Sequence, residues 1–177
     1  KILTLLALTI SFSMNAQIST VGTDNSGYYS TAMGFFTTAS GDYSTAFGVS
    51  TISLGPISTA IGNQTQANGQ SSLAGGEFSI ASGYTSLAIG SGVTASGLES
   101  TAFGKNTTAS GDSSTAMGTN SIASGYASST LGQDTEASGT YSLAIGINTK
   151  ATNQASFASG ADTFAGGQES VAMGRAT

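Results

Sequence analysis

Carboxylates are the only side chains in this sequence that could support acid–base or metal chemistry. The 177 residues include no Cys and no His, which excludes thiolate chemistry, disulfide bonds, imidazole catalysis and zinc sites of the usual type. Nine acidic residues remain: Asp24, Asp42, Glu77, Glu99, Asp112, Asp134, Glu136, Asp162 and Glu169. An enzyme built on this sequence would have to work with carboxylates alone.

The spacing of these carboxylates argues against a catalytic pair or a metal site. Asp42 and Asp112 occupy equivalent positions five copies apart in the repeat described below. That separates them by about 24 Å at the usual strand spacing, too far for a glycosidase-type pair. Asp134 and Glu136 are close in sequence, but a hard cation normally needs about six oxygen ligands. We therefore expect no enzymatic activity, no catalytic residues, no metal and no cofactor, with the carboxylates at solvated turns.

The net charge and the amino-acid composition limit the kinds of molecule that this protein could bind. The formal net charge is −5, and the only bases beyond the N-terminus are Lys105, Lys150 and Arg175, so nucleic acid and anionic membrane surfaces are improbable partners. Ser, Thr, Ala and Gly number 30, 25, 25 and 25, together 105 residues. Such a composition is typical of disordered segments. The order in which these residues occur, however, is highly regular.

The N-terminus has the pattern of an export signal. Lys1 is followed by an apolar run from Ile2 to Ile10 and on to Phe12, and then by small and polar residues. The run is shorter than the roughly 20 residues of a membrane span. We expect a signal peptide over residues 1–16 with cleavage after Ala16, an N-terminal lead-in over 17–28, and no membrane span.

From residue 29 to residue 177 the sequence repeats every fourteen residues without an insertion or deletion, in ten full copies and one partial copy. The second position is Ser and the sixth is Gly in all eleven copies. The fourth is Ala except at Thr130, and in the ten full copies the eleventh is Ala except at Ser53 and the thirteenth is Gly except at Asn153. Since Asn tolerates a positive φ, we expect a left-handed backbone at the thirteenth position.

This pattern predicts one coil per copy, with two short strands separated by two glycine-marked turns. The fold class is therefore all-β, a parallel β-roll (β-solenoid). Because a fourteen-residue coil has a thin interior and strand side chains alternate, Ser and Ala at the second and fourth positions should point inward. The ninth and eleventh positions of the opposite strand should complete the core. The clearest core positions are Ser30, Ala32, Gly34, Ser44, Ala46, Gly48, Ser86, Ala88, Gly90, Ser142, Ala144 and Gly146.

Larger apolar residues then face outward at the fifth position. They are Met33, Phe47, Ile61, Ile89, Phe103, Met117, Leu131, Ile145 and Met173. A continuous exposed apolar stripe implies a partner surface, and a closed homo-oligomer about the rod axis would bury the same stripe on every chain. The opposite assignment, with large residues inside, predicts a wider monomeric solenoid.

The repeated motif S-x-A-x-G resembles the YadA-like head repeats of trimeric autotransporter adhesins. The segment SLAIG at residues 86–90 and 142–146 is an especially close match, and the resemblance covers roughly residues 23 to 177. It implies a left-handed β-roll assembled as a homotrimer that projects from a bacterial surface and binds host matrix or other cells. The coiled-coil stalk and membrane barrel of the full family architecture do not occur in this sequence, which stops in mid-repeat at Thr177, so we expect a fragment or a truncated gene product, and the sequence does not indicate how the protein is anchored.

The resulting hypothesis is a non-enzymatic adhesin head or shaft, exported and either associated with the outer membrane or secreted. Its partners would be two further copies of the chain and an extracellular matrix protein or cell-surface ligand. A structural spacer or fibre segment with its binding tip elsewhere is the alternative. An ice-binding solenoid is less favoured, because the rank of Thr31, Thr45 and Thr59 is broken by Leu73 and Leu87. Tyrosines beside the turns (Tyr29, Tyr43, Tyr84, Tyr126 and Tyr141) either contact a partner or cap the edge of the roll.

Overall fold

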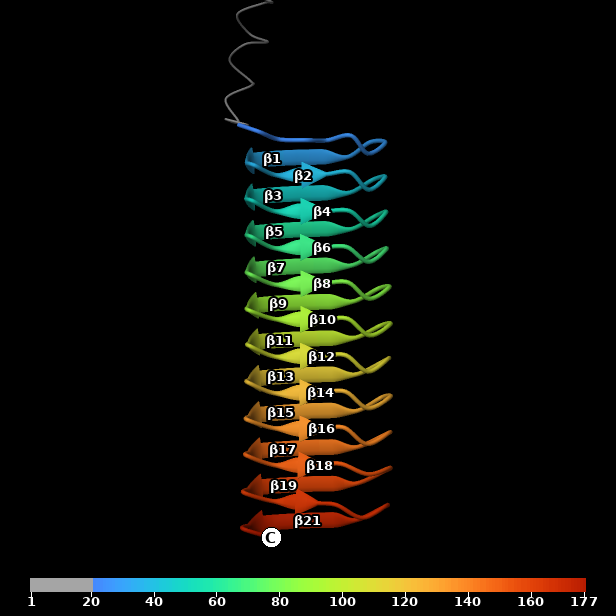
Figure 1. Ribbon diagram of the computed structural model, residues 1–177, viewed down its shortest axis with the longest axis vertical. Coiled ribbons are helices and arrows are strands. Elements are labelled where there is room, and N and C mark those ends of the chain that lie inside the picture. Colours follow the sequence, from blue (N-terminus) through green and yellow to red (C-terminus); the bar gives the residue numbers. More distant parts are fainter. Residues whose placement is uncertain (1–20) are drawn as a thin grey trace, which may run out of the picture.

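The structure is a computed structural model that describes residues 21–177 as a stack of flat coils (Figure 1). The predicted signal peptide over residues 1–16 lies outside the described residues. Each coil contains a five-residue strand and a two-residue strand. No helix occurs within residues 21–177, and so nothing in that range could cross a membrane as a helix.

The strands form two parallel sheets that face each other across the coil. The long strands form an eleven-stranded sheet: β1 (Thr31–Phe35), β3 (Thr45–Val49), β5 (Thr59–Asn63), β7 (Leu73–Glu77), β9 (Leu87–Ser91), β11 (Thr101–Lys105), β13 (Thr115–Thr119), β15 (Ser129–Gln133), β17 (Leu143–Ile147), β19 (Phe157–Ala161) and β21 (Val171–Arg175). The short strands form a ten-stranded sheet: β2 (Thr38–Ala39), β4 (Ile52–Ser53), β6 (Gln66–Ala67), β8 (Ile80–Ala81), β10 (Thr94–Ala95), β12 (Thr108–Ala109), β14 (Ile122–Ala123), β16 (Glu136–Ala137), β18 (Lys150–Ala151) and β20 (Phe164–Ala165).

Every strand pairs with the equivalent strand of the next coil, so identical repeat positions lie above one another. Ala46 pairs with Ala32 and Ala60, for example, and Gly48 pairs with Gly34 and Gly62. The predicted parallel β-solenoid with two strands per fourteen-residue coil is thereby confirmed. At the usual inter-strand spacing, the coils make a rod on the order of 50 Å long.

The second strand is shorter than the pattern predicts, because the regular hydrogen-bond ladder ends after the eleventh position. The N–H groups of Ser40 and Gly41 both donate to the carbonyl of Ser53, at 3.0 and 3.3 Å. Two donors on one acceptor end the regular alternation of the ladder. The same double contact recurs in most of the later coils.

The turns are made by the first and eighth positions, which have a left-handed backbone in almost every coil. Phe36 and Tyr43 have φ values of 52° and 57°. From the sixth copy to the tenth, the eighth position is occupied by Asn106, Asn120, Asp134, Asn148 and Asp162, the types that best tolerate this conformation. Elsewhere in these two columns non-Gly residues accept a strain of about 1 kcal/mol each.

The prediction of a left-handed backbone at the thirteenth position is wrong, since Gly41 and Asn153 do not have a positive φ. Glycine is required there for space: a Cβ on Gly41 would lie 2.2 Å from the carbonyl oxygen of Gly55. The sixth position lies inside the long strand rather than at a turn. Gly48 there has φ 134°, and its Cβ would lie 1.9 Å from the oxygen of Gly62.

The interior contains only small side chains, with Val93 the largest that is fully buried. The alanines of the fourth and eleventh positions line it together with serines and threonines of the second and ninth. Many of the second-position serines donate their hydroxyl to the carbonyl three residues earlier, as Ser86 does to Gly83 at 2.7 Å. By contrast, most ninth-position threonines, including Thr51 and Thr65, have buried hydroxyls without a partner in the protein.

The coil structure begins at Val21, before the first full copy of the repeat. Val21 and Asp24 form parallel bridges to Phe35 and Thr38, fourteen positions further on. Gly22, at the place of an eighth position, has φ 65°. The expected lead-in over residues 17–28 therefore includes, from residue 21, a half coil that covers the first long strand.

We expect Gly104→Ala to lower the stability of the roll by about 2–3 kcal/mol or more, through overpacking and backbone strain. Its Cβ would lie 2.0 Å from the oxygen of Gly118, at φ 129°. Gly75→Ala is the matched control, because its Cβ would only approach Ile89 at 3.6 Å. Thermal unfolding followed by circular dichroism measures both, and equal midpoints would contradict the close approach of the coils.

We expect Thr65→Val to leave the stability unchanged or raise it by up to about 1 kcal/mol, because the buried hydroxyl has no partner to lose. Val93 occupies the equivalent position of another coil without exposure. Ser86→Ala should instead lower stability by about 1 kcal/mol, since it removes a buried hydrogen bond. Urea unfolding measures both variants, and the midpoint of Ser86→Ala should be clearly lower than that of Thr65→Val. If Thr65→Val loses more stability than Ser86→Ala, the Thr65 hydroxyl has a hydrogen-bond partner.

Candidate functional site

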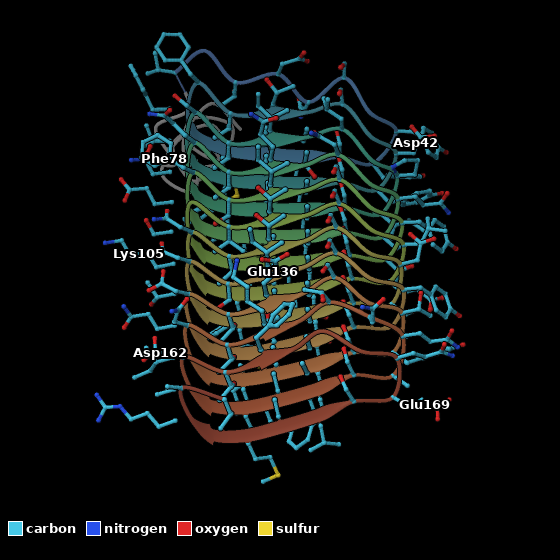
Figure 2. The ribbon with its side chains drawn as sticks, turned by 60° about the horizontal axis from the view of Figure 1, so that its bottom comes forward. Asp42, Phe78, Lys105, Glu136, Asp162 and Glu169 are labelled. Carbon is cyan, nitrogen blue, oxygen red and sulfur yellow. The ribbon has the colours of Figure 1, made fainter. Side chains whose placement is uncertain are left out.

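The roll offers two faces and two edges on which functional side chains can lie. Figure 2 shows Asp42 and Glu169 on one edge, Phe78, Lys105 and Asp162 on the opposite edge, and Glu136 on the face between them. The edge with Asp42 is formed by the fourteenth and first positions and the opposite edge by the seventh and eighth. The outer face of the long strands carries the third and fifth positions, and that of the short strands carries the tenth.

The fifth-position side chains form a column on the outer face of the long strands, here called the apolar stripe. Phe47, Ile61 and Phe103 are 48, 46 and 52% exposed, Leu131 and Met173 are 52 and 61% exposed, and Met117 is 38% exposed. Met33, Ile89 and Ile145 in the same column are half-buried. Gly75 and Ser159 are the two positions that interrupt it. Leu73, Leu87, Leu143 and Phe157, half-buried at the third position, widen the stripe.

The side chains expected in the core lie inside the coil. Ser44, Ala46, Ser86, Ala88, Ser142 and Ala144 are at most 2% exposed. Ser30 and Ala32, in the first full copy, are only half-buried because just a half coil covers them. Gly34, Gly48, Gly90 and Gly146 lie in the long strands and are half-buried.

The carboxylates of the fourteenth position stabilise the stacking of the coils. A carboxylate oxygen of Asp42 accepts the backbone N–H of Tyr28 at 3.0 Å, and one of Asp112 accepts that of Leu98 at 2.9 Å. In both cases the donor belongs to the preceding coil at the equivalent position. These two side chains are thus engaged in the same local contact rather than with each other.

Asp134 and Glu136 also make separate contacts. Asp134 accepts hydrogen bonds from the side-chain amides of Asn120 and Gln133, both at 3.0 Å. Glu136 forms an ion pair with Lys150 at 3.1 Å, on a surface where such a pair contributes little to stability. Within the described part of the chain, no three His, Cys, Asp or Glu side chains lie together as a metal site would require.

A shallow depression of about 520 Å³ lies on the outer face of the short strands. Its lining comes from the eighth and tenth positions of three coils and consists of Ser50, Ile52, Gln64, Gln66, Phe78 and Ile80. No ionisable side chain lines it, so it offers neither an acid nor a base. Sequence reasoning missed this depression, because the two columns that form it vary in residue type from copy to copy.

All six tyrosines of the chain lie on the edge formed by the fourteenth and first positions, here called the tyrosine edge. Tyr28, Tyr29 and Tyr43 form one cluster, with ring centroids 4.2 to 5.9 Å apart. Tyr126 and Tyr141 form an edge-to-face pair at 5.5 Å. A side-chain hydrogen bond with Tyr29, and to a lesser degree desolvation, raises the pKa of Tyr28. Tyr28 escaped the sequence analysis because it precedes the first full copy.

The repeat and the faces it builds agree with the comparison with known families. The model of the YadA head domain repeat, which spans two copies, matches residues 26–51, 58–77, 67–92, 95–121 and 137–163. A comparison of the chain with curated proteins gives no match. Because the matched segments cover more than half of the 177 residues and the structure is the stack of coils that the repeat predicts, this chain belongs to the YadA head domain repeat family.

Proposed function

We propose that the chain is the head or shaft of a trimeric adhesin, a rigid rod that binds host matrix or other cells through its repetitive sides. The observation that carries this proposal is the apolar stripe. Six of its members are 38 to 61% exposed, although the interior contains nothing larger than Val93. A soluble monomer rarely leaves so long an apolar surface uncovered.

A homotrimer is the assembly that this stripe supports best. Nine of the eleven coils present a large apolar side chain at the same place, so a partner that covers the stripe must run the length of the rod, as further copies of the same rod would. Burying the exposed part of each large side chain is favourable by about 1 kcal/mol. Summed over the column in three chains, the gain is sufficient for a stable complex. The family supports the same assembly and a left-handed coil.

The remaining surfaces support a binding role rather than a catalytic one. The carboxylates are dispersed over both edges and the short-strand face, and five of them already have hydrogen-bond or ion-pair partners in the protein. The family is one of surface-exposed bacterial adhesins, which agrees with the signal peptide predicted over residues 1–16. We infer export to the cell surface, with the outer faces of the trimer available to matrix proteins or cell-surface ligands.

We expect the mature chain to sediment with three times the mass of one chain. Ile89→Asp combined with Ile145→Asp should dissociate it, because each chain would then bury charges in the interface. Ile80→Asp combined with Ile122→Asp, on the opposite face, is the matched control and should leave the mass unchanged. Analytical ultracentrifugation measures all three proteins. A stable wild-type monomer, or dissociation by the control alone, would refute this interface.

We also expect beads coated with the wild-type trimer to attach to cultured cells or to a surface coated with extracellular matrix extract. The repeated binding surface should make attachment strongly dependent on coating density, since many weak contacts act together. Beads coated with an unrelated acidic protein control for charge. Failure to attach to either surface would favour the alternative of a structural spacer.

A further inference from the structure

The tyrosines are segregated on the surface in a way that the fold alone does not require. All six lie on the tyrosine edge, whereas the phenylalanines among residues 21–177 lie at the third, fifth, seventh, eighth and tenth positions. Tyr29, Tyr43 and Tyr141 are 72, 57 and 59% exposed. Packing against the roll therefore does not explain the choice of Tyr over Phe. An exposed tyrosine can contact a partner through its apolar ring while its hydroxyl forms hydrogen bonds with the partner or with water.

The backbone beneath this edge shows that its side chains are retained at a cost. The first position has φ values between 50° and 60° in all eleven copies, a conformation that Gly adopts freely. The chain has 25 glycines, yet none lies at a first position. Even the β-branched Ile57 and Thr85 occur there, with φ 60° and 53°. Side chains are thus kept along this edge at a strain of about 1 kcal/mol or more each, although Gly would relieve it.

The charges on the tyrosine edge are all negative. Asp42, Glu99, Asp112 and Glu169 lie there, whereas Lys105, Lys150 and Arg175 occupy the seventh and tenth positions of their coils. Among the described residues the edge thus carries four acids and no base. Asp42 lies beside the cluster of Tyr28, Tyr29 and Tyr43, within one residue of Tyr43. A tyrosine ring next to a carboxylate attracts ammonium and guanidinium groups through the ring face and the charge together.

The aromatic groups are spaced along the rod. Tyr84 lies four coils after Tyr28, and Tyr126 three coils after Tyr84, which corresponds to about 19 and 14 Å at the usual strand spacing. Glu99 and Asp112 lie in the coils between Tyr84 and Tyr126. A small cation could contact only one such group. An extended chain that carries several cationic side chains could contact all of them.

We propose that the tyrosine edge binds an extended polypeptide segment rich in arginine and lysine, laid along the rod with its cations over the tyrosine rings and beside the carboxylates. This inference rests on the proposed adhesin function and specifies the surface and the partner chemistry. The apolar stripe lies at the third and fifth positions of the coil, whereas the tyrosine edge lies at the fourteenth and first.

The test measures binding of a fluorescently labelled peptide of alternating Arg and Gly to the mature trimer by anisotropy. We expect Tyr28→Ser, Tyr29→Ser and Tyr43→Ser together to weaken binding about tenfold, since three cation–π contacts are lost. Phe36→Ser with Phe78→Ser on the opposite edge is the matched control and should bind like wild type. Equal affinity of the tyrosine variant and this control would overturn the proposal.

A charge series provides a second route that does not depend on folding of the tyrosine variant. Glu99→Gln with Glu169→Gln should weaken peptide binding and reduce its salt dependence, whereas Glu77→Gln with Asp162→Asn removes the same charge from the other edge and should have a smaller effect. Equal effects of the two pairs would reduce the interaction to net charge and refute the site. Tyrosine-dependent binding of a neutral oligosaccharide but not of the peptide would refute the cationic partner.

Attachment of coated beads separates failure of this inference from failure of the proposed function. If wild-type beads attach and the tyrosine variant attaches equally well, the adhesin function stands and the tyrosine edge is not its binding surface. If wild-type beads do not attach but the peptide binds in a tyrosine-dependent manner, the edge is a binding site and the adhesin function is contradicted.

Discussion

The close stacking of one coil on the next is the constraint on which the rest of this structure depends. Equivalent backbone positions lie above one another, and at the sixth and thirteenth positions the approach leaves no room for a Cβ atom, as at Gly48 and Gly41. A coil of fourteen residues closed in this way has an interior that accepts Ala, Ser, Thr and a single Val. Large apolar side chains do not fit inside such a coil and must therefore lie on its outer surface. The exposed Phe, Ile, Leu and Met side chains are therefore a direct result of the thin core, and they form the surface that the proposed trimer would cover.

Much of this arrangement could be predicted from the sequence, because the repeat supplies eleven observations of each position. Invariance of Ser and near-invariance of Ala indicated the interior at Ser44 and Ala46, and alternation then placed Phe47 outside. The sequence alone could not show whether Gly is required at the thirteenth position for lack of space or for a left-handed backbone. Gly meets either requirement, and Asn153 in place of one Gly suggested a left-handed backbone, which is wrong. The left-handed residues are at the first and eighth positions, where Gly is rare.

Features that depend on contacts between coils were also beyond the sequence pattern. The short second strand results from two N–H groups sharing one carbonyl, as Ser40 and Gly41 share that of Ser53, and no residue type marks this geometry. The half coil from Val21 preserves the period but lacks the S-x-A-x-G motif. The sequence predicted that five of the tyrosines lie beside the turns. It did not show that Tyr28 joins them, because Tyr28 precedes the first full copy of the repeat.

The in-register stacking has an evolutionary consequence. Because each coil contacts only its two neighbours and all coils are alike in backbone, removal or duplication of one whole copy in the gene preserves the in-register backbone pairing of the coils. Unequal recombination between such similar coding segments would therefore lengthen or shorten the rod in steps of about 4.8 Å. The length of the rod could in this way change without any change in how the protein folds.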